Sequence, residues 1–285
     1  MRLALIGVGL IGGSFARALR AAGKVDFVIG FDSQPDALKR AIDLEVIDQS
    51  AESAARAVEH ADLAMIATPV GSMQRVLQAI APHLSPAAIV TDVGSTKASV
   101  IAAARHELGS AFERFVPGHP IAGREHSGVE YSEAALFNDK LFICTPVDRT
   151  DAEAVREVEA LWRSVGCHTD RMTPEEHDTV FTAVSHLPHV LAFALVAQIA
   201  ADPDAARKFA LAGAGFRDFT RIAASSPALW SDVCVANRDA LGEELKQHRS
   251  LLAELQKAID ESDREALQSA FSRAGESLAR LSSAH

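Results

Sequence analysis

A glycine-rich segment near the amino terminus has the spacing of a dinucleotide-binding loop. Gly7, Gly9 and Gly12 follow an apolar run and open a stretch with helical spacing. In such a loop the first glycine permits a tight turn, the second lets the backbone approach a pyrophosphate, and the third lets helix and strand pack closely. The first helical residues, Leu10 and Ile11, then offer unpaired N–H groups to the phosphates. The segment predicts a nucleotide site.

Asp32 and three later residues fit the rest of such a site. Asp32 ends the second apolar run, about 20 residues past the last glycine, where a carboxylate accepts hydrogen bonds from ribose hydroxyls. No Arg directly follows it to hold a 2′-phosphate, so we expect NAD rather than NADP. Thr68, Pro69 and Ser95 follow two later apolar runs, so we expect them near the ribose and nicotinamide. Thr68 and Ser95 could equally be helix N-caps.

Histidines occur repeatedly in polar motifs. His119 follows a further apolar run, and His177, His186 and His189 share one predicted helix, where the spacing of three puts the last two on one face. A neutral histidine is suited to taking a proton near neutral pH. The alternative is a set of hydrogen-bonded structural histidines. We expect no metal, because the helix lacks the Glu of an H-E-x-x-H motif and no Cys lies nearby in sequence.

A glycine-flanked segment supplies two arginines. Arg217 and Arg221 flank Asp218, and Trp230 follows shortly after. Two guanidinium groups in such a segment suit bidentate recognition of carboxylates. The alternative is surface pairing with Asp218, which contributes little to stability.

The elements that must position these residues divide the chain in two. Up to about Met172, short apolar runs alternate with helical patterns, which is typical of βαβ units and a parallel sheet. From Thr173 to the end the pattern predicts helices only, including a long, largely buried helix over 177–201 and two amphipathic helices over 237–281. We therefore expect an α/β Rossmann-type domain, residues 1–172, followed by an all-α domain, residues 173–285. The predicted strands are Leu3–Ile6, Phe27–Phe31, Leu63–Ala67 and Ala88–Val93, with 114–116, 141–144 and 167–171 as runs that could extend the same sheet.

Composition excludes several classes of protein. The 285 residues carry a net charge of −10, with 48% hydrophobic and 23% charged residues. These values suit a folded protein and argue against disorder and against a surface that wraps nucleic acid. The longest apolar stretch, 190–201, is too short to span a bilayer, so we expect a soluble, cytoplasmic protein that binds no membrane.

Together, these segments resemble the prephenate/arogenate (cyclohexadienyl) dehydrogenase family of tyrosine biosynthesis. The similarity runs from the glycine loop through Gly94–Ser95 and His119–Pro120 to residues 185–189 and on to Trp230. It implies NAD-dependent oxidative decarboxylation of prephenate to 4-hydroxyphenylpyruvate, of arogenate to tyrosine, or of both. A hydride passes from ring C4 to NAD while CO₂ leaves. It also implies a dicarboxylate substrate and a homodimer formed through the helical domain.

The resemblance assigns roles by match to the family's motifs. His119 is the base or hydrogen-bond acceptor for the substrate hydroxyl, and Ser95 helps to orient both His119 and that hydroxyl. Arg221 holds a substrate carboxylate, and Asp218 and Trp230 shape that wall. The remaining residues implied to line the pocket are Glu125, His177, Ser185, His186 and His189.

Two other functions share parts of this pattern. A β-hydroxyacid dehydrogenase has a similar glycine-loop domain, but such enzymes usually rely on a lysine on the long helix, and residues 177–201 contain none. A non-catalytic protein that senses NAD would need no polar cluster facing the nicotinamide. The motifs at His119 and Arg221 argue against it.

Overall fold

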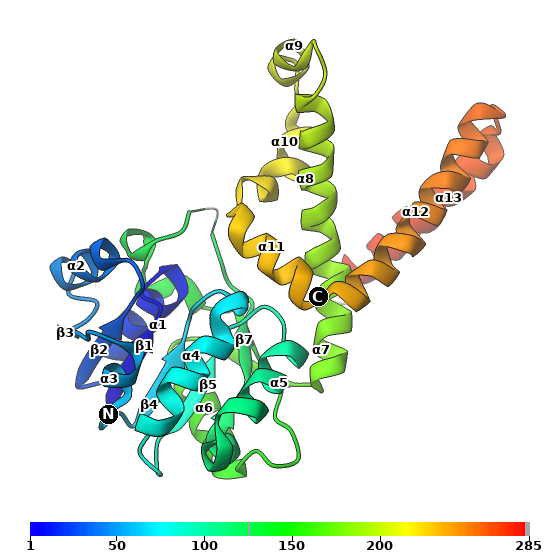
Figure 1. The fold of residues 1–285 in the computed structure, drawn as a ribbon. Helices are drawn as coiled ribbons and strands as arrows, with labels where there is room; N and C mark the ends of the chain where they lie inside the picture. Colours follow the sequence, from blue (N-terminus) through cyan, green and yellow to red (C-terminus); the bar gives the residue numbers. More distant parts are fainter. Residues whose placement is uncertain (125, 283–285) are drawn as a thin grey trace. The chain divides into compact units, whose positions relative to one another are not determined.

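The computed structural model describes residues 1–124 and 126–282 of the chain. It divides into two compact units, residues 1–238 and residues 239–285. The first unit contains all the strands of the described residues, together with most of the helices (Figure 1).

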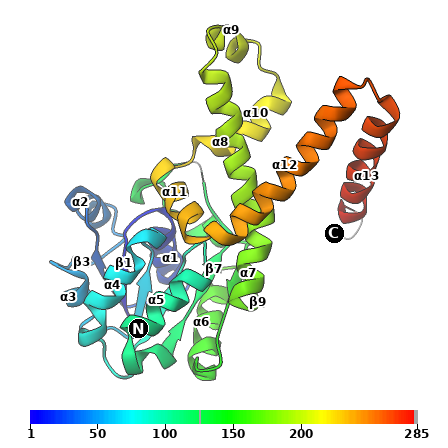
Figure 2. The same cartoon turned by 45° about the vertical axis from the view of Figure 1, so that its right-hand side comes forward.

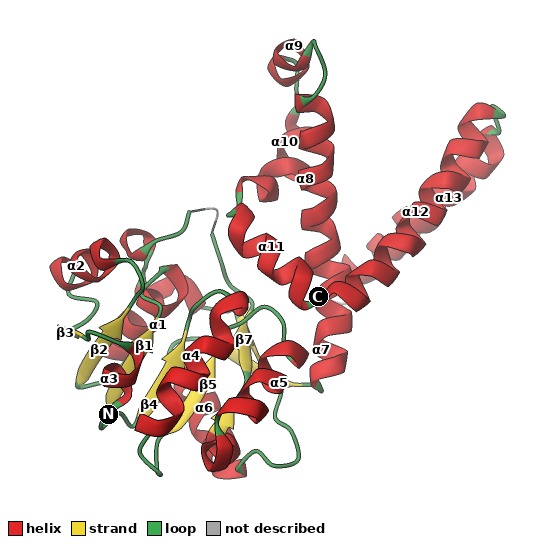
Figure 3. Cartoon of the chain, in the orientation of Figure 1, coloured by secondary structure: helices red, strands yellow, loops and turns green. Residues whose placement is uncertain are grey.

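A six-stranded parallel sheet forms the centre of the first unit (Figure 3). Its order is β3–β2–β1–β4–β5–β6, so β1 and β4 are neighbours at the point where the strand order reverses. In sheets of this kind ligands bind at that point, outside the carboxyl ends of the strands. The four predicted strands and the run at 114–116 are confirmed to within one residue at either end. The strands are β1 (Arg2–Ile6), β2 (Phe27–Phe31), β3 (Gln49–Ser50), β4 (Leu63–Ile66), β5 (Ile89–Asp92) and β6 (Phe115–Val116).

Both faces of this sheet are buried. Side chains alternate between faces along a strand, so Leu3 and Leu5 join the apolar cluster that contains residues of α1, α2 and α6. Ala4 and Ile6 join the opposite cluster, which contains residues of α3, α4 and α5. The helices are α1 (Leu10–Ala21), α2 (Pro35–Asp43), α3 (Ala54–Val58), α4 (Met73–Ile80), α5 (Ala98–Glu107) and α6 (Ala152–Ser164). Short 3₁₀ turns are η1 (Val70–Ser72), η2 (Ala81–His83), η3 (Gly109–Arg114), η4 (Val129–Tyr131) and η5 (Ala134–Phe137).

A second, three-stranded sheet consists of β7 (Gly118–Pro120), β8 (Leu141–Cys144) and β9 (His168–Arg171). β7 is antiparallel to β8, and β8 is parallel to β9. The expectation that the runs at 141–144 and 167–171 extend the first sheet is therefore wrong. The chain changes sheet at Pro117, between β6 and β7, where proline has no N–H to donate to a continuing ladder.

One helical segment runs from α7 (Pro174–Phe181) through a π-helical turn, η6 (Thr182–His186), into α8 (Leu187–Ala200) (Figure 2). A long helix was expected here, but the expectation that it is largely buried is wrong. In α8 only Leu187 and Ala192 are buried. The π-helical turn η6 ends two residues before Pro188. In a regular α-helix the ring of Pro188 would clash with the carbonyl four residues earlier.

The segment Pro174–Ala200 also has the length and hydropathy of a membrane span, and it is the one such helix within residues 1–124 and 126–282. Of the apolar 18-residue stretch within this segment, 28% is buried. Core helices of soluble proteins can have the same length and hydropathy, so these two properties alone do not assign the segment Pro174–Ala200 to a membrane.

The remaining elements are helical. The first unit continues with α9 (Ala205–Ala210), α10 (Ala214–Thr220), the 3₁₀ turn η7 (Arg221–Ala224) and α11 (Pro227–Ala236). The two long helices that follow are α12 (Arg238–Asp260) and α13 (Arg264–Ser282), which confirms the predicted pair and its break near residues 260–263. Asp263 begins the last helix by accepting a hydrogen bond of 2.9 Å from the backbone N–H of Ala266.

A buried ion pair joins the two sheets. Lys97 Nζ donates to the carboxylate of Asp92, at the end of β5, and to the carbonyl of Gly118 in β7 at 2.7 Å. Neither charged side chain has any exposed surface. Asp92 also accepts from the backbone N–H groups of Gly94 at 2.7 Å and Gly118 at 3.1 Å. Buried charges are tolerated when they are paired and hydrogen-bonded in this way, so the pair fixes the loop after β5 against the start of β7.

Removing the cation of this pair should destabilise the fold strongly. In Lys97→Met the Asp92 carboxylate stays buried without its partner, which costs about 3–5 kcal/mol of unfolding free energy. Urea denaturation measures the loss. The control is Arg149→Met, which breaks a pair with Glu113 whose side chains are 62% and 59% exposed, and it should cost at most about 1 kcal/mol. Equally small losses in both variants would contradict the importance of the pair.

Candidate active site

The glycine loop lies between β1 and α1, at the carboxyl edge of the six-stranded sheet. Gly7 has a φ of +93°, and a Cβ there would lie 2.5 Å from the carbonyl oxygen of Ala67. A Cβ on Gly12 would lie 2.5 Å from the carbonyl oxygen of Gly7. At Gly9 a Cβ would meet nothing within 4 Å. Because Gly9 is also the N-cap of α1 and has no capping side chain, the first N–H groups of that helix are available to an anion.

Asp32 lies against this loop. It directly follows β2, and the N–H of Gly7 donates to the carbonyl of Phe31 at 2.8 Å. One carboxylate oxygen of Asp32 accepts from the N–H of Val8 at 2.9 Å, and the other accepts from the N–H of Gln34 at 2.9 Å. A carboxylate can accept about four hydrogen bonds, so capacity remains for the two hydroxyls of a ribose.

The loops after β4 and β5 complete this edge. Thr68 Oγ1 is buried and makes no hydrogen bond within the described part of the chain. Such a hydroxyl lowers stability unless a ligand pairs with it. Pro69 is exposed, and Ser95 is half-buried in the loop that Asp92 anchors. The open surface at Gly9, the free end of α1 and the unpaired Thr68 hydroxyl all fit a dinucleotide.

His119 lies in β7, directly after the glycine that Lys97 and Asp92 hold. Its Nδ1 lies 2.9 Å from Nε2 of His177, and its ring packs edge-on against Phe181 with centroids 5.1 Å apart. Burial holds the pKa of His119 well below its usual 6.5, and the charges of His177 and Lys97 lower that pKa further. His119 is therefore neutral at pH 7 and can accept a proton.

His177 lies behind His119 and has no exposed surface. Its Nδ1 lies 2.8 Å from a carboxylate oxygen of Asp178. Asp178 also accepts from the backbone N–H groups of Lys97 at 2.7 Å and Ala98 at 2.9 Å, which start α5. The expectation that His177 lines the pocket does not match this position, because its neighbours enclose it completely. Asp178 and Lys97 were not anticipated as site residues, although an acid directly after a motif histidine was a usable signal.

His186 is the last residue of the π turn and is almost fully buried. Burial lowers its pKa to about 4. The side-chain amide of Asn237 donates to Nδ1 of His186 at 3.1 Å, to Thr182 Oγ1 at 2.5 Å and to the carbonyl of Asp178 at 3.3 Å. Since Nδ1 accepts, Nε2 carries the proton in the neutral ring. This nitrogen is buried, and a hydrogen bond between the ring and the backbone of Ser95 raises the pKa of His186 against the larger effect of burial.

His189 and Trp230 form a stacked pair with ring centroids 3.5 Å apart, which brings α8 and α11 together. His189 Nδ1 lies 2.9 Å from the carbonyl oxygen of Ser185. The Trp230 ring also lies 6.1 Å from that of His186. The predicted spacing thus brings both histidines to one aromatic side chain.

The arginine segment forms α10 and η7. Arg221 begins η7 and is exposed. Asp218 is exposed on α10, whereas Arg217 donates to the carbonyl of Ala212 at 3.1 Å within its own segment. Burial contributes most to the lowered pKa of His189, and the charge of Arg221 lowers that pKa further. Arg221 is therefore within electrostatic reach of His189.

The same kind of coupling links the histidines to one another. Burial lowers the pKa of both His119 and His186 most strongly; beyond burial, the charge of His186 lowers the pKa of His119, and that of His189 lowers the pKa of His186. His119 in β7, His186 in η6, His189 in α8 and Arg221 in η7 are thus electrostatically coupled from one to the next, and we call them the histidine strip.

Glu125 lies outside the described residues, so its place in the pocket stays a prediction. Its neighbour Arg124 forms an ion pair with Glu133. The backbone N–H of Glu133 donates to Ser14 Oγ in α1 at 3.0 Å. This bond attaches the segment around Glu133 to the helix that follows the glycine loop.

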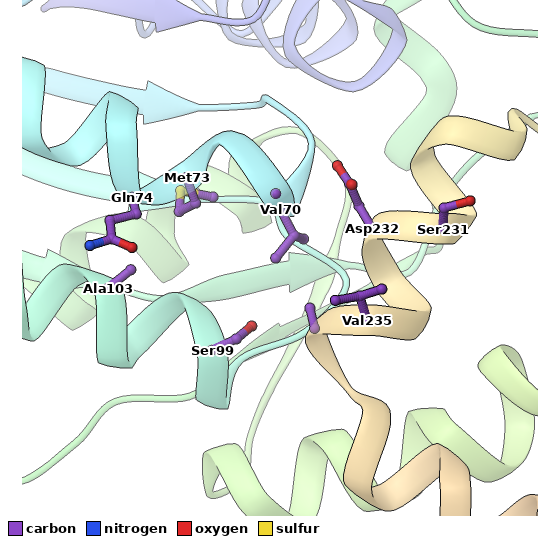
Figure 4. A pocket seen from close by; sticks show the side chains of 10 residues that line it. Val70, Met73, Gln74, Ser99, Ala103, Ser231, Asp232 and Val235 are labelled. Atoms are coloured by element: carbon purple, nitrogen blue, oxygen red, sulfur yellow. The ribbon is translucent and has the colours of Figure 1, made fainter.

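A cavity of about 340 Å³ lies between α4, α5 and α11, beside the loop after Pro69 (Figure 4). The Asp232 carboxylate closes against Gly71, where a Cβ would lie 2.6 Å from its oxygen. None of the site histidines lines this cavity. Its walls are Val70, Gly71, Met73, Gln74, Ser99, Ala103, Ser231, Asp232, Val235 and Ala236.

Known proteins are similar to the chain over most of its length. The family model for the prephenate dehydrogenase nucleotide-binding domain matches residues 15–170, and the model for the prephenate dehydrogenase dimerization domain matches residues 173–273. The prephenate dehydrogenase of Bacillus subtilis is 36% identical over 92% of this chain and 71% of its own length. The cyclohexadienyl dehydrogenase of Zymomonas mobilis is 35% identical over 99% of this chain and 97% of its own.

A solved structure agrees in fold. The prephenate dehydrogenase of A. aeolicus, in complex with hydroxyphenyl propionate and NAD+, superimposes with a TM-score of 0.89 at 36% identity, covering 98% of this chain and 97% of its own. A nucleotide-binding edge, a strip of histidines and these matches over both halves lead to one conclusion: the chain belongs to the prephenate dehydrogenase family.

Proposed function

We propose that this protein catalyses the NAD-dependent oxidative decarboxylation of prephenate, of arogenate, or of both. The observation that carries the proposal is His119, a neutral histidine next to the nucleotide edge of the sheet, with Nε2 not hydrogen-bonded to any described residue. The A. aeolicus relative holds NAD+ and hydroxyphenyl propionate, which pairs a nicotinamide with a phenol ring whose side chain ends in a carboxylate.

The chemistry requires a proton acceptor and clamps for two carboxylates. NAD+ supplies the hydride acceptor for the hydrogen on ring C4. His119 Nε2 takes the C4 hydroxyl proton while the C–O bond becomes a carbonyl. As the ring carboxylate leaves as CO₂, its bonding electrons make the ring aromatic and the proton returns to the phenol oxygen. Ser95 orients the hydroxyl, and Arg221 holds a carboxylate.

The remaining roles follow from position. Asp32 receives the ribose hydroxyls, and Thr68 and Pro69 flank the nicotinamide side. His186 borders the pocket beside the backbone of Ser95. Ser185, His189, Trp230 and Asp218 border the carboxylate end, and the pocket role of Glu125 stays a prediction from its motif. His177 acts through His119 rather than on the substrate.

The purified protein should reduce NAD+ when prephenate or arogenate is added, and NAD+ should be preferred to NADP+. In His119→Asn, kcat should fall by roughly 10²–10⁴-fold, because a positioned general base contributes about that much. Absorbance of the reduced nicotinamide measures both reactions. The control is His106→Asn, since the His106 side chain is 76% exposed and lies in the last turn of α5, at the opposite end of that helix from Lys97 and Ala98. An unchanged kcat in His119→Asn would refute the base assignment, and no turnover of either substrate would refute the function.

Arg221→Ala should raise KM for the cyclohexadiene substrate by roughly 10- to 100-fold, because a hydrogen bond to a charged group is worth about 1.5–3 kcal/mol. KM for NAD+ should stay within about twofold, since Arg221 lies on the substrate side. The matched control is Arg217→Ala, which removes a guanidinium from the same segment that is bonded to a backbone carbonyl. Equal effects of the two variants would remove Arg221 from the carboxylate site.

We also propose that the two functional domains meet between Met172 and Thr173, and that the second domain forms a homodimer. Thr173 caps α7 directly after β9, and the dimerization-domain match begins at residue 173. In the first unit, Val184 and Leu211 are 66% and 76% exposed. In the second unit, Ile259, Phe271 and Leu278 are 59–66% exposed. Large contiguous apolar surfaces are typical of protein–protein interfaces, and these exposed side chains are candidates for the one that the dimerization-domain match implies.

Light scattering of the full chain in buffer without detergent tests this assembly. We expect twice the mass of one chain and a protein that stays in solution, as a cytoplasmic enzyme must. A single-chain mass would contradict the dimer. A protein that needs detergent would contradict the cytoplasmic location and would assign Pro174–Ala200 to a membrane.

A further inference from the structure

We propose that Asp178 and His177 act as a positioning pair that holds neutral His119 in the tautomer protonated at Nδ1, which leaves Nε2 as the proton acceptor. The inference rests on the proposed function of His119 and adds the reason why one ring nitrogen serves as the base. It follows from a chain of hydrogen bonds that runs from the start of α5 to β7.

Asp178 is the fixed end of this chain. Its carboxylate accepts from the backbone N–H groups of Lys97 at 2.7 Å and Ala98 at 2.9 Å. Burial opposes ionisation, but these bonds and the contact with His177 lower the pKa of Asp178 below its usual value. An ionised carboxylate has only lone pairs to offer. The neighbouring imidazole must therefore donate.

His177 passes this constraint on. Its Nδ1, 2.8 Å from Asp178, carries the proton. Burial lowers the pKa of His177 despite the carboxylate, so the ring is neutral at pH 7 and its Nε2 has a lone pair. That lone pair faces Nδ1 of His119 at 2.9 Å. Two lone pairs cannot bond to each other, so His119 Nδ1 must carry the proton.

His119 then has one free lone pair, on Nε2. This atom has no hydrogen bond to the described residues and is not among the buried unpaired atoms, so it is accessible to a ligand. Phe181 packs on both imidazoles, with centroids 5.1 Å from His119 and 4.5 Å from His177. The rings are therefore held in orientation as well as in protonation state.

The pair also compensates charge during the reaction. His119 becomes an imidazolium when it takes the hydroxyl proton, in a place where burial, His177 and Lys97 all disfavour positive charge. The carboxylate of Asp178, one ring away, stabilises that cation through His177. The same arrangement of carboxylate, imidazole and reacting group underlies serine hydrolases, where loss of the orienting carboxylate leaves the wrong tautomer.

Two substitutions at one buried position separate positioning from packing. His177→Phe keeps a ring of similar size beside Phe181 but offers His119 no acceptor. His177→Gln keeps an amide oxygen that can accept from His119 and an amide N–H that can donate to Asp178. We expect kcat to fall by on the order of 10²-fold or more in His177→Phe and to recover to within about tenfold of wild type in His177→Gln. In both variants, KM for NAD+ and KM for the cyclohexadiene substrate should each stay within about threefold of the wild-type value.

The direct readout is nitrogen-15 NMR of the labelled imidazoles, which reports the tautomer of each histidine without any substrate. In the wild type we expect the Nδ1–H tautomer at both His119 and His177, and a shift of His119 to Nε2–H in His177→Phe. An Nε2–H tautomer at either residue of the wild type would overturn the proposal, whether or not the variants fold. Equal kcat in the Phe and Gln variants would also overturn it. An inactive wild type with the expected tautomers would instead refute the proposed function.

Discussion

The buried ion pair between Lys97 and Asp92 is the interaction on which the site depends. The side chain of Lys97 reaches the carbonyl of Gly118 in β7, and its backbone N–H is bound by Asp178 in α7. Asp92 holds Gly94 and Gly118 by their N–H groups. The loop after β5, the strand that carries His119 and the helix that carries His177 therefore converge on Lys97. Loss of the Lys97 side chain would directly disturb the loop after β5 and the strand that carries His119, because neither has room to relax in a packed interior.

Electrostatics then decide how the histidines behave. Burial lowers the pKa of His119, His177, His186 and His189, so the strip is neutral at pH 7 and its rings act as hydrogen-bonding groups. In the proposed function, the positive field for an anionic substrate comes from Arg221 and from the first turn of α1. A net charge of −10 is compatible with this, because most acidic side chains of the described residues are not buried.

Local patterns in the sequence predicted much of the fold. The strands at 27–31 and 141–144 were placed to the residue, because buried strands are short apolar runs between turn residues. The glycine spacing and Asp32 predicted the nucleotide edge, since that motif is local. The second sheet was not foreseen, because the pairing of β7 with β8 is set by a distant contact after Pro117. The burial of α8 was overestimated, since apolar composition alone does not distinguish a buried helix from one with an exposed apolar face.

The same distinction between local patterns and long-range contacts applies to the candidate site. His119, His186 and His189 were singled out by motif, and their geometry supports the roles proposed for them. The partners that orient them were missed, because Asp178 bonds the backbone of Lys97 across 81 positions, and Asn237 reaches His186 across 51. Hydrogen bonds of this kind leave no periodic trace in a sequence. The π turn that places His186 is also absent from any local pattern except Pro188.

A crystal structure of this protein with NAD+ and 3-(4-hydroxyphenyl)propionate tests the central claim most directly, because it shows which protein atom meets the ring hydroxyl. The hydroxyl should lie within hydrogen-bonding distance of His119 Nε2, about 2.6–3.2 Å, with His119 Nδ1 still bonded to His177 and the carboxylate of the ligand at Arg221. A ring hydroxyl that meets another side chain, with His119 Nε2 facing only solvent, would contradict the account.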